Sequence, residues 1–224
     1  IIQTVLIRKM KKLPIYFLII ILIAGYSCSR VKETKYPSGT LKSSQQYKGK
    51  KQQGVSTWYF ENGKKELEVN YLNDKPHGTA TRWYQSGIRE SMNTYVEGKR
   101  TGPSRKWDTQ GLLIEELNYL NDSLHGNYLL YYENGQVKIE GFYNMGLYDS
   151  TWTYFEITGM KVGDGSYKKG TGLQRAFYPN GKLRLTVPYE NNKRNGYEIW
   201  YNQQGKEVNR VLYKDDVAVK TELN

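Results

Sequence analysis

The sequence contains few of the residues on which redox, metal and acid–base chemistry depend. It has 224 residues but only 1 cysteine and 2 histidines. A single cysteine cannot form an intramolecular disulfide bond or a thiolate metal cluster. No serine, threonine or cysteine has a recognisable catalytic partner, and no phosphate-binding glycine loop opens a helical pattern. We therefore expect no enzyme activity, no cofactor and no metal site.

Clustered charge of one sign is also missing. The chain has 33 basic and 22 acidic residues, a net charge of +11, but no run of five or more basic residues. Four of the basic residues precede Cys28, so 29 basic and 22 acidic residues, or +7, remain beyond residue 27. A mild and dispersed excess of this kind does not predict a nucleic-acid site.

No apolar run is long enough to cross a bilayer. The longest, Ile15 to Ala24, has 10 residues, against the roughly 20 that a membrane-spanning helix needs. It follows a basic stretch and has the length of a secretory signal core. Residues 1–27 are therefore predicted to be a signal peptide. Met10 opens a typical start, which indicates that residues 1–9 are an upstream extension of the reading frame.

The residues Gly25-Tyr26-Ser27-Cys28 that end this segment resemble the lipobox of bacterial lipoproteins. The resemblance implies that Cys28 is lipidated and becomes the new amino terminus, anchoring the protein in the cell envelope, at the outer membrane if the host has one. Two or more acyl chains make such an anchor stable. Residues 28–35 are then expected to form a mobile polar tether. A general signal peptide with an incidental cysteine is the alternative.

What the sequence has in abundance is tyrosine and glycine, 21 and 22 residues respectively. An aromatic content of 14% is too high for a disordered chain, while 38% hydrophobic residues suits a thin structure rich in turns. One set of tyrosines recurs every 24 residues, with a single gap of 22: Tyr47, Tyr71, Tyr95, Tyr119, Tyr143, Tyr167, Tyr189 and Tyr213. The two missing residues are expected to lie in a loop between Tyr167 and Gly172.

Two further sets of residues keep the same period. A small residue opens each unit: Gly54, Gly78, Gly102, Gly126, Ser150, Gly172 and Gly196. An aromatic residue follows five positions later: Tyr59, Trp83, Trp107, Tyr131, Phe155, Phe177 and Tyr201. Seven units thus follow a half unit from Tyr36 to Tyr47, so the repeat domain is predicted to span residues 36–224. Its charged final strand is expected to protect an exposed sheet edge.

Each unit has the pattern of a β-hairpin. Two runs rich in aromatic and β-branched residues flank Asn62-Gly63, a pair that favours a two-residue type I′ turn. Such a loop would pair Gly54 with Tyr71, and the equivalent residues in every later unit. The tyrosine ring could then cover a residue that has no side chain, which would explain the glycine.

The repeat resembles the MORN repeat (membrane occupation and recognition nexus) in its bacterial, antitoxin-like variant. The segments "HGTATRWYQSGIRESMNTY" and "HGNYLLYYENGQVKIEGFY" carry the resemblance most clearly. It implies an all-β fold in which tandem antiparallel hairpins of about 24 residues form an elongated, twisted single sheet. It also implies a module that binds proteins or assembles them.

The remaining polar candidates have ordinary explanations. His77 and His125 lie two units apart, and because adjacent hairpins are about 10 Å apart they would be about 20 Å from each other, too far to share a metal. Glu61 and Glu133 are excluded as a catalytic carboxylate pair by the same spacing. We expect all four to be turn residues.

The sequence therefore predicts a membrane-anchored, non-catalytic interaction or scaffold module with a protein partner and no nucleic-acid partner. Two alternatives remain open. One is an antitoxin-like inhibitor of a partner protein. The other is a cell-surface carbohydrate-binding protein, because a thin sheet must expose one face and some of the tyrosines on it.

Overall fold

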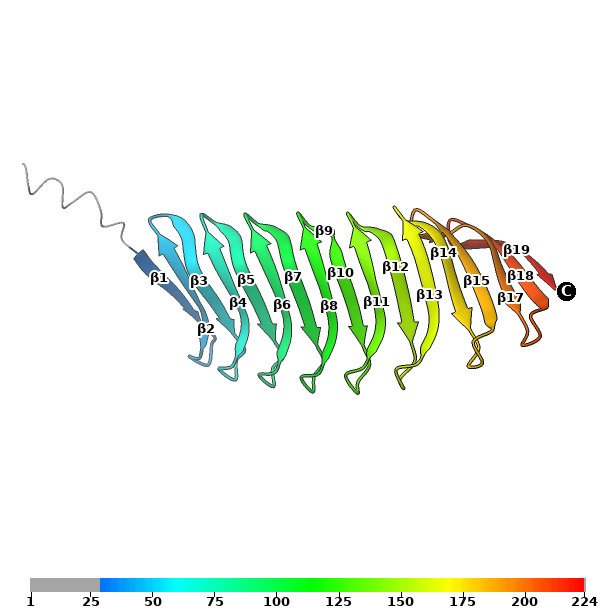
Figure 1. Cartoon of the computed structure of the whole chain (residues 1–224). Coiled ribbons are helices and arrows are strands. Elements are labelled where there is room, and N and C mark those ends of the chain that lie inside the picture. The colour runs from blue at the N-terminus through cyan, green and yellow to red at the C-terminus, as the bar shows by residue number, and fades with distance from the viewer. Residues whose placement is uncertain (1–28, 224) are drawn as a thin grey trace, which may run out of the picture.

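The computed structural model describes residues 29–223, and this part of the chain contains strands and turns but no helix (Figure 1). Nineteen strands form one open antiparallel sheet in which consecutive strands pair. β9 and β10 share one place in the sheet, interrupted at His125, and β16 and β17 share another, interrupted at Asn195. The predicted fold, tandem hairpins in an elongated single sheet, is confirmed.

The strands follow one another in chain order along the long axis of the molecule (Figure 1). Their bounds are β1 Ser29–Lys35, β2 Leu41–Lys48, β3 Lys51–Tyr59, β4 Lys65–Leu72, β5 Lys75–Trp83, β6 Arg89–Val96, β7 Lys99–Trp107, β8 Leu113–Leu120, β9 Ser123–Leu124, β10 Gly126–Tyr131, β11 Val137–Asn144, β12 Leu147–Phe155, β13 Lys161–Lys168, β14 Thr171–Phe177, β15 Leu183–Glu190, β16 Lys193–Arg194, β17 Gly196–Tyr201, β18 Glu207–Lys214 and β19 Val217–Leu223.

The loop at Asn62-Gly63 is not the predicted type I′ turn. Gly63 N–H donates to the Phe60 carbonyl at 2.9 Å, and Phe60 N–H donates to the Lys64 carbonyl at 2.8 Å. Gly63 has a φ of 80°, whereas Asn62 is not among the residues with positive φ. This is a three-residue loop, a type I turn closed by a glycine bulge. The same bonds recur in all the loops on this side of the sheet, including those at Gly135 and Gly181.

The predicted register is nevertheless confirmed. Gly54 pairs with Tyr71, and the equivalent pairs continue to Gly196 with Tyr213. A longer loop should have shifted this register by one residue. However, Trp58 pairs with Leu67 while Tyr59 pairs with Lys65, so one residue of β4 bulges and restores the alignment.

Type I′ turns do occur, but at the opposite side, where one hairpin leads into the next. Asn73 and Asp74 join β4 to β5 with φ angles of 50° and 69°. The second residue of each such turn donates its N–H to a backbone carbonyl about 22 residues earlier, for example Asp74 to Gln52 at 3.0 Å and Asp122 to Arg100 at 2.9 Å. These bonds form a turn ladder that ties each hairpin to its predecessor.

The repeat glycines occupy bulges beside these turns. Val69 pairs with Ala80 but Tyr71 pairs with Pro76, so β5 has two extra residues around Gly78. Gly78 has a φ of 91° and Gly102 a φ of 106°, a region that side chains disfavour. A Cβ on Gly78 would meet Asn70, 3.6 Å away, rather than a tyrosine ring. The packing explanation for these glycines is therefore wrong, and backbone conformation is the reason for them.

The two missing residues come from such a bulge and not from a loop. Lys168 and Thr171 flank an ordinary two-residue turn, and β13 pairs with β14 without any register shift, from Tyr167 with Gly172 onward. Gly172 accordingly has no positive φ. Its Cβ would instead lie 2.0 Å from the Ser166 carbonyl oxygen. This hairpin joins its predecessor more tightly than the others do.

Tyrosine hydroxyls link neighbouring hairpins at the three-residue loops, but only at every second one. Tyr36 donates to the Tyr59 carbonyl at 2.7 Å and Tyr84 to the Trp107 carbonyl at 2.9 Å. Tyr132 and Tyr178 continue the series with the carbonyls of Phe155 and Tyr201. The loops between them have Phe60, Asp108, Glu156 and Asn202 at that position. The structure therefore repeats in pairs of hairpins as well as singly.

Both ends of the array differ from expectation. Residues 29–35 are not a tether: they form β1, whose pairing with β2 completes a hairpin from the predicted half unit. A strand needs no apolar pattern when its backbone is paired and its side chains are exposed. At the other end, β19 is a strand as predicted, but Val217 and Leu223 are 63% and 82% exposed. The predictions for residues 1–28, including Cys28, lie outside the described residues.

The bulge geometry makes a testable prediction. Gly102→Ala should lower the free energy of unfolding by about 1–3 kcal/mol, since it forces a side chain into a disfavoured backbone region. Ser150, with a φ of 58°, is the one repeat position without glycine. Ser150→Gly should therefore leave stability unchanged or raise it by up to about 1 kcal/mol. Urea unfolding followed by circular dichroism tests both, and equal losses in the two variants would contradict the bulge explanation.

Candidate functional site: a tyrosine face, an aromatic cluster and a groove

The repeat tyrosines all lie on one face of the sheet, which we call the tyrosine face. Tyr71 and Tyr95 lie on it together with Leu67, Val69 and Ala80, around a shallow depression of about 260 Å³. Arginines cover several of these rings: Arg100 lies 4.0 Å from the centre of Tyr119, and Arg194 lies 4.0 Å from that of Tyr213. The repeat tyrosines are half-buried, except for Tyr167, which is 5% exposed.

The seven aromatic residues that follow the opening residue of each unit by five positions are also half-buried. They end the first strand of each hairpin, and their carbonyls accept the tyrosine hydroxyls described above in alternate units. Lys65 lies 5.5 Å from the ring centre of Trp83, and Arg89 lies 5.0 Å from that of Trp107. These contacts connect neighbouring hairpins.

An aromatic cluster interrupts the tyrosine face where the bulge is missing. It consists of Tyr128, Tyr143, Tyr148, Trp152, Tyr167 and Tyr189. The ring centres of Tyr148 on β12 and Tyr189 on β15 are 6.1 Å apart. In a flat sheet, three strand spacings would separate them by about 14 Å. The sheet therefore curls around the cluster, and Figure 1 shows the strands after β13 turning behind the rest.

Glycines inside the strands make room for this cluster. A Cβ on Gly141 would lie 2.2 Å from the Trp152 ring, and one on Gly165 would lie 2.4 Å from Tyr167. Trp152 is 4% exposed and Tyr167 is 5% exposed, so the centre of the cluster is shielded from solvent. The sequence analysis missed this cluster. The available signal was Gly163-Asp164-Gly165, two glycines within one predicted strand.

The opposite face, the polar face, is held by ion pairs between adjacent strands. Arg105 Nε lies 2.5 Å from a Glu116 carboxylate oxygen, and its hydrogen bond lowers the pKa of that carboxyl group. Burial alone would raise the pKa of Asp164, but Lys161 and Arg175, at 3.0 Å and 2.7 Å, lower it below its ordinary value. Both carboxylates are thus ionised at neutral pH and unsuited to proton donation.

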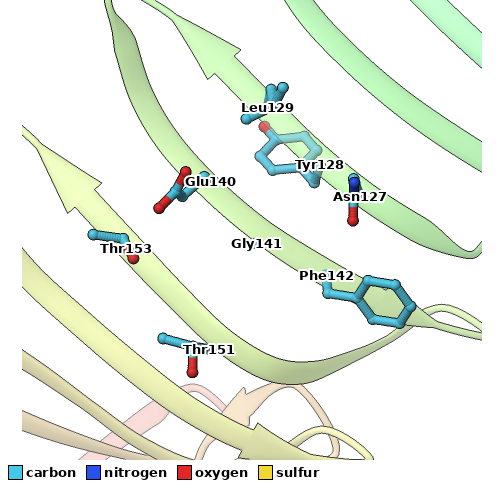
Figure 2. A pocket seen from close by; sticks show the side chains of 8 residues that line it. All are labelled: Asn127, Tyr128, Leu129, Glu140, Gly141, Phe142, Thr151 and Thr153. Atoms are coloured by element: carbon cyan, nitrogen blue, oxygen red, sulfur yellow. The ribbon is translucent and has the colours of Figure 1, made fainter.

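A groove of about 340 Å³ crosses the polar face over β10, β11 and β12. Its side chains are those of Asn127, Leu129, Glu140, Phe142, Thr151 and Thr153, arranged around Gly141 (Figure 2). Where the groove crosses the sheet, Glu140 pairs with Thr153 and Phe142 with Asp149, which leaves three residues of β12 between them in the bulge around Ser150. Phe142 supplies an apolar ring, and its neighbours supply hydrogen-bonding groups.

The histidines and the carboxylates of the sequence analysis do not form a common site. Neither histidine is the predicted turn residue, because each two-residue turn ends before it: His77 lies in β5 and His125 lies between β9 and β10. His77 Nδ1 accepts the N–H of Glu97 at 3.4 Å. The His125 ring packs edge-on against Phe142 at 6.1 Å, and its Nδ1 is buried without a hydrogen-bond partner in residues 29–223. Glu61 and Glu133 are exposed. No group of three or more potential ligands within that range is placed to hold a metal ion.

With this geometry in view, the family comparison is informative. Three segments match the MORN repeat variant: residues 52–73, 124–145 and 171–191. Each covers one hairpin almost completely: β3–β4, β9–β11 and β14–β15 respectively. No match was found among curated proteins. MORN-like repeats suggest a repeat-based module for binding or scaffolding, and this all-β architecture is typical of non-catalytic modules.

The described residues contain no helix long and apolar enough to span a membrane.

The aromatic cluster and Tyr154, which interacts with Tyr167 of the cluster, predict a loss of stability at high pH. Burial raises the pKa of Tyr128 and Tyr154 from 10.0 to about 12, and it also raises the pKa of Tyr143 and Tyr167. Because the folded pKa exceeds the unfolded one, this stability is complete below pH 10.0 and decreases as pH rises toward about 12. Urea unfolding across this range should show the decrease.

Tyrosinate absorbance and near-ultraviolet circular dichroism provide the control. Part of the absorbance should appear only together with the loss of tertiary signal, as unfolding exposes the clustered rings. Complete ionisation in a single step around pH 10.0, with an unchanged dichroism spectrum, would contradict this assignment.

Proposed function

We propose that this protein is a membrane-anchored, non-catalytic module that binds or assembles other proteins on an elongated sheet. The observation that carries the proposal is the single-layer architecture. Nineteen strands form one sheet, and its aromatic residues are mostly half-buried rather than enclosed between layers. Repeat arrays of this kind present extended surfaces that suit large partners.

Lipidation of Cys28 would give this surface a fixed position. β1 begins at Ser29, directly after Cys28, so an anchor there would hold the first strand at the bilayer without an intervening linker. The array would then extend from the membrane, starting with the basic strand β1, which contains three basic residues and one acidic residue. Weak attraction to anionic headgroups would support the same placement.

The anchor is tested by replacing its attachment site. The membrane-fraction protein should have a mass larger than the polypeptide after residue 27 by a lipid-sized increment, and Cys28→Ala should abolish the increment and release the protein. Cys28→Ser is the matched control because it removes the thiol with little change in size. Unchanged mass and location in both variants would refute the anchor and favour the antitoxin-like inhibitor of a soluble partner.

Carbohydrate binding is a second candidate function, supported by the groove on the polar face. Sugar rings stack on aromatic side chains and hydrogen-bond to carboxylate, amide and hydroxyl groups. Phe142, Glu140 and Asn127 provide these groups within one groove. Because Glu140 is negatively charged, the groove suits neutral sugars better than acidic ones.

Titration with neutral and acidic oligosaccharides tests the groove. A neutral ligand should bind, and Phe142→Ala should weaken it by about tenfold, the equivalent of one lost aromatic contact. Asn70→Ala is the matched control, since Asn70 occupies the equivalent position three units earlier. Identical affinities in the two variants, or no binding across the panel, would eliminate the groove as a sugar site.

A further inference from the structure

In the part of the chain that the structure describes, the strand β19 lies at an edge of the sheet. Within residues 29–223 it pairs with β18 on one side only. Val217, Val219 and Leu223 are 63%, 54% and 82% exposed, a concentration of apolar side chains that open edges usually avoid. The other edge strand, β1, exposes only one large apolar residue, Val31, and has three basic residues and one acidic residue.

The pairing of β19 with β18 determines which of its backbone groups are free. Lys214 and Val217 close a two-residue turn and therefore form a hydrogen-bonded pair. Hydrogen-bonded positions alternate along β18, so Leu212 and Arg210 are the next two. Their partners Lys220 and Glu222 therefore form backbone hydrogen bonds with β18. The N–H and C=O groups of Thr221 and Leu223 then point outward, where another strand could pair with them.

We propose that β19 pairs antiparallel with β19 of a second copy of this chain, around a two-fold axis at Thr221. The two strands can form backbone hydrogen bonds only when residues whose N–H and C=O groups point away from β18 lie opposite each other. One strand can therefore shift along the other only in steps of two residues. Centring the pair on Lys220 places two lysines opposite each other. Centring it on Glu222 places two glutamates opposite each other. Centring it on Thr221 places Lys220 opposite Glu222 of the second copy, and charge selects this register.

Apolar contacts are compatible with this register. By residue count, Val219, the bulged residue of β19, would lie opposite Leu223 of the second copy, so two exposed apolar side chains would come close together. Lys220 and Glu222 already contact each other within one chain at 2.7 Å, and Glu222 also binds Arg210. The cross-strand pairs therefore extend an existing charge network. A two-fold pair closes on itself, whereas pairing of β19 with β1 would continue into filaments.

This assembly goes beyond the proposed function. Directly paired residues lie on the same face of a sheet, so the tyrosine faces of the two copies would form one continuous surface of twice the length. The two β1 strands would lie at its far ends, which would place the two proposed anchors far apart.

Thiol cross-linking tests the register in the full chain with Cys28 replaced by serine, so that each introduced cysteine is the only thiol at its site. At the two-fold axis, Thr221 lies opposite itself with a Cα separation of about 5.5 Å, within the range that a disulfide spans. Thr221→Cys should therefore give a covalent dimer on a non-reducing gel under mild oxidation. Val219→Cys is the matched control: Val219 lies opposite Leu223, so its two thiols cannot meet. The double variant V219C/L223C should cross-link again.

Charge reversal provides an independent test with little effect on folding. Lys220→Glu places glutamates opposite each other and should reduce the cross-linking of T221C several-fold, while circular dichroism remains unchanged. Glu222→Lys should do the same, and a mixture of the two charge variants should recover a mixed dimer. Equal cross-linking of T221C and V219C, a ladder of higher species, or absence of any dimer in folded protein would each overturn the proposal.

Discussion

The backbone conformation at the joint between hairpins is the constraint on which the rest of the structure depends. A single-layer sheet has no second layer to pack against, so each hairpin is stabilised mainly by its two neighbours. At most junctions between hairpins, two extra residues bulge around a glycine with positive φ. The two-residue turn at the junction also donates a hydrogen bond to the preceding hairpin. The bulge sets the direction in which each hairpin leaves the last, and hence the course of the array.

One departure from this pattern accounts for the most enclosed part of the molecule. Between β13 and β14 the bulge is absent, and Gly172 allows close contact with the Ser166 carbonyl. The sheet curls there, so that Tyr148 and Asn192, on elements far apart in a flat sheet, are joined by a 2.8 Å hydrogen bond. The aromatic cluster fills the inside of the curl. The absence of these two residues thus makes the otherwise regular sheet curl and enclose a small aromatic core.

The two faces and the two edges offer different kinds of contact. The tyrosine face presents half-buried rings partly covered by arginines, the polar face presents paired charges and one groove, and the edges present unpaired backbone. Residues 29–223 thus combine three kinds of surface, each with its own chemistry: aromatic rings, paired charges and unpaired backbone.

The sequence by itself determined the fold class, the period and the register. The reason is that glycines with positive φ and the aromatic residues recur at a fixed spacing, which is visible without any knowledge of tertiary contacts. The sequence also placed aromatic residues such as Trp83 and Tyr131 at one position of every unit, and the structure finds both at the end of a strand, whereas His77, expected in a turn, lies in β5. Only the tertiary structure decided the loop type at Asn62-Gly63, since a three-residue loop plus a compensating bulge gives the same pairing as a two-residue loop. It likewise decided that residues 29–35 are a strand, because backbone pairing to β2 requires no apolar pattern. The aromatic cluster was beyond the sequence because it arises where hairpins deviate from the average repeat, and curvature accumulates over several strands before it brings their side chains together.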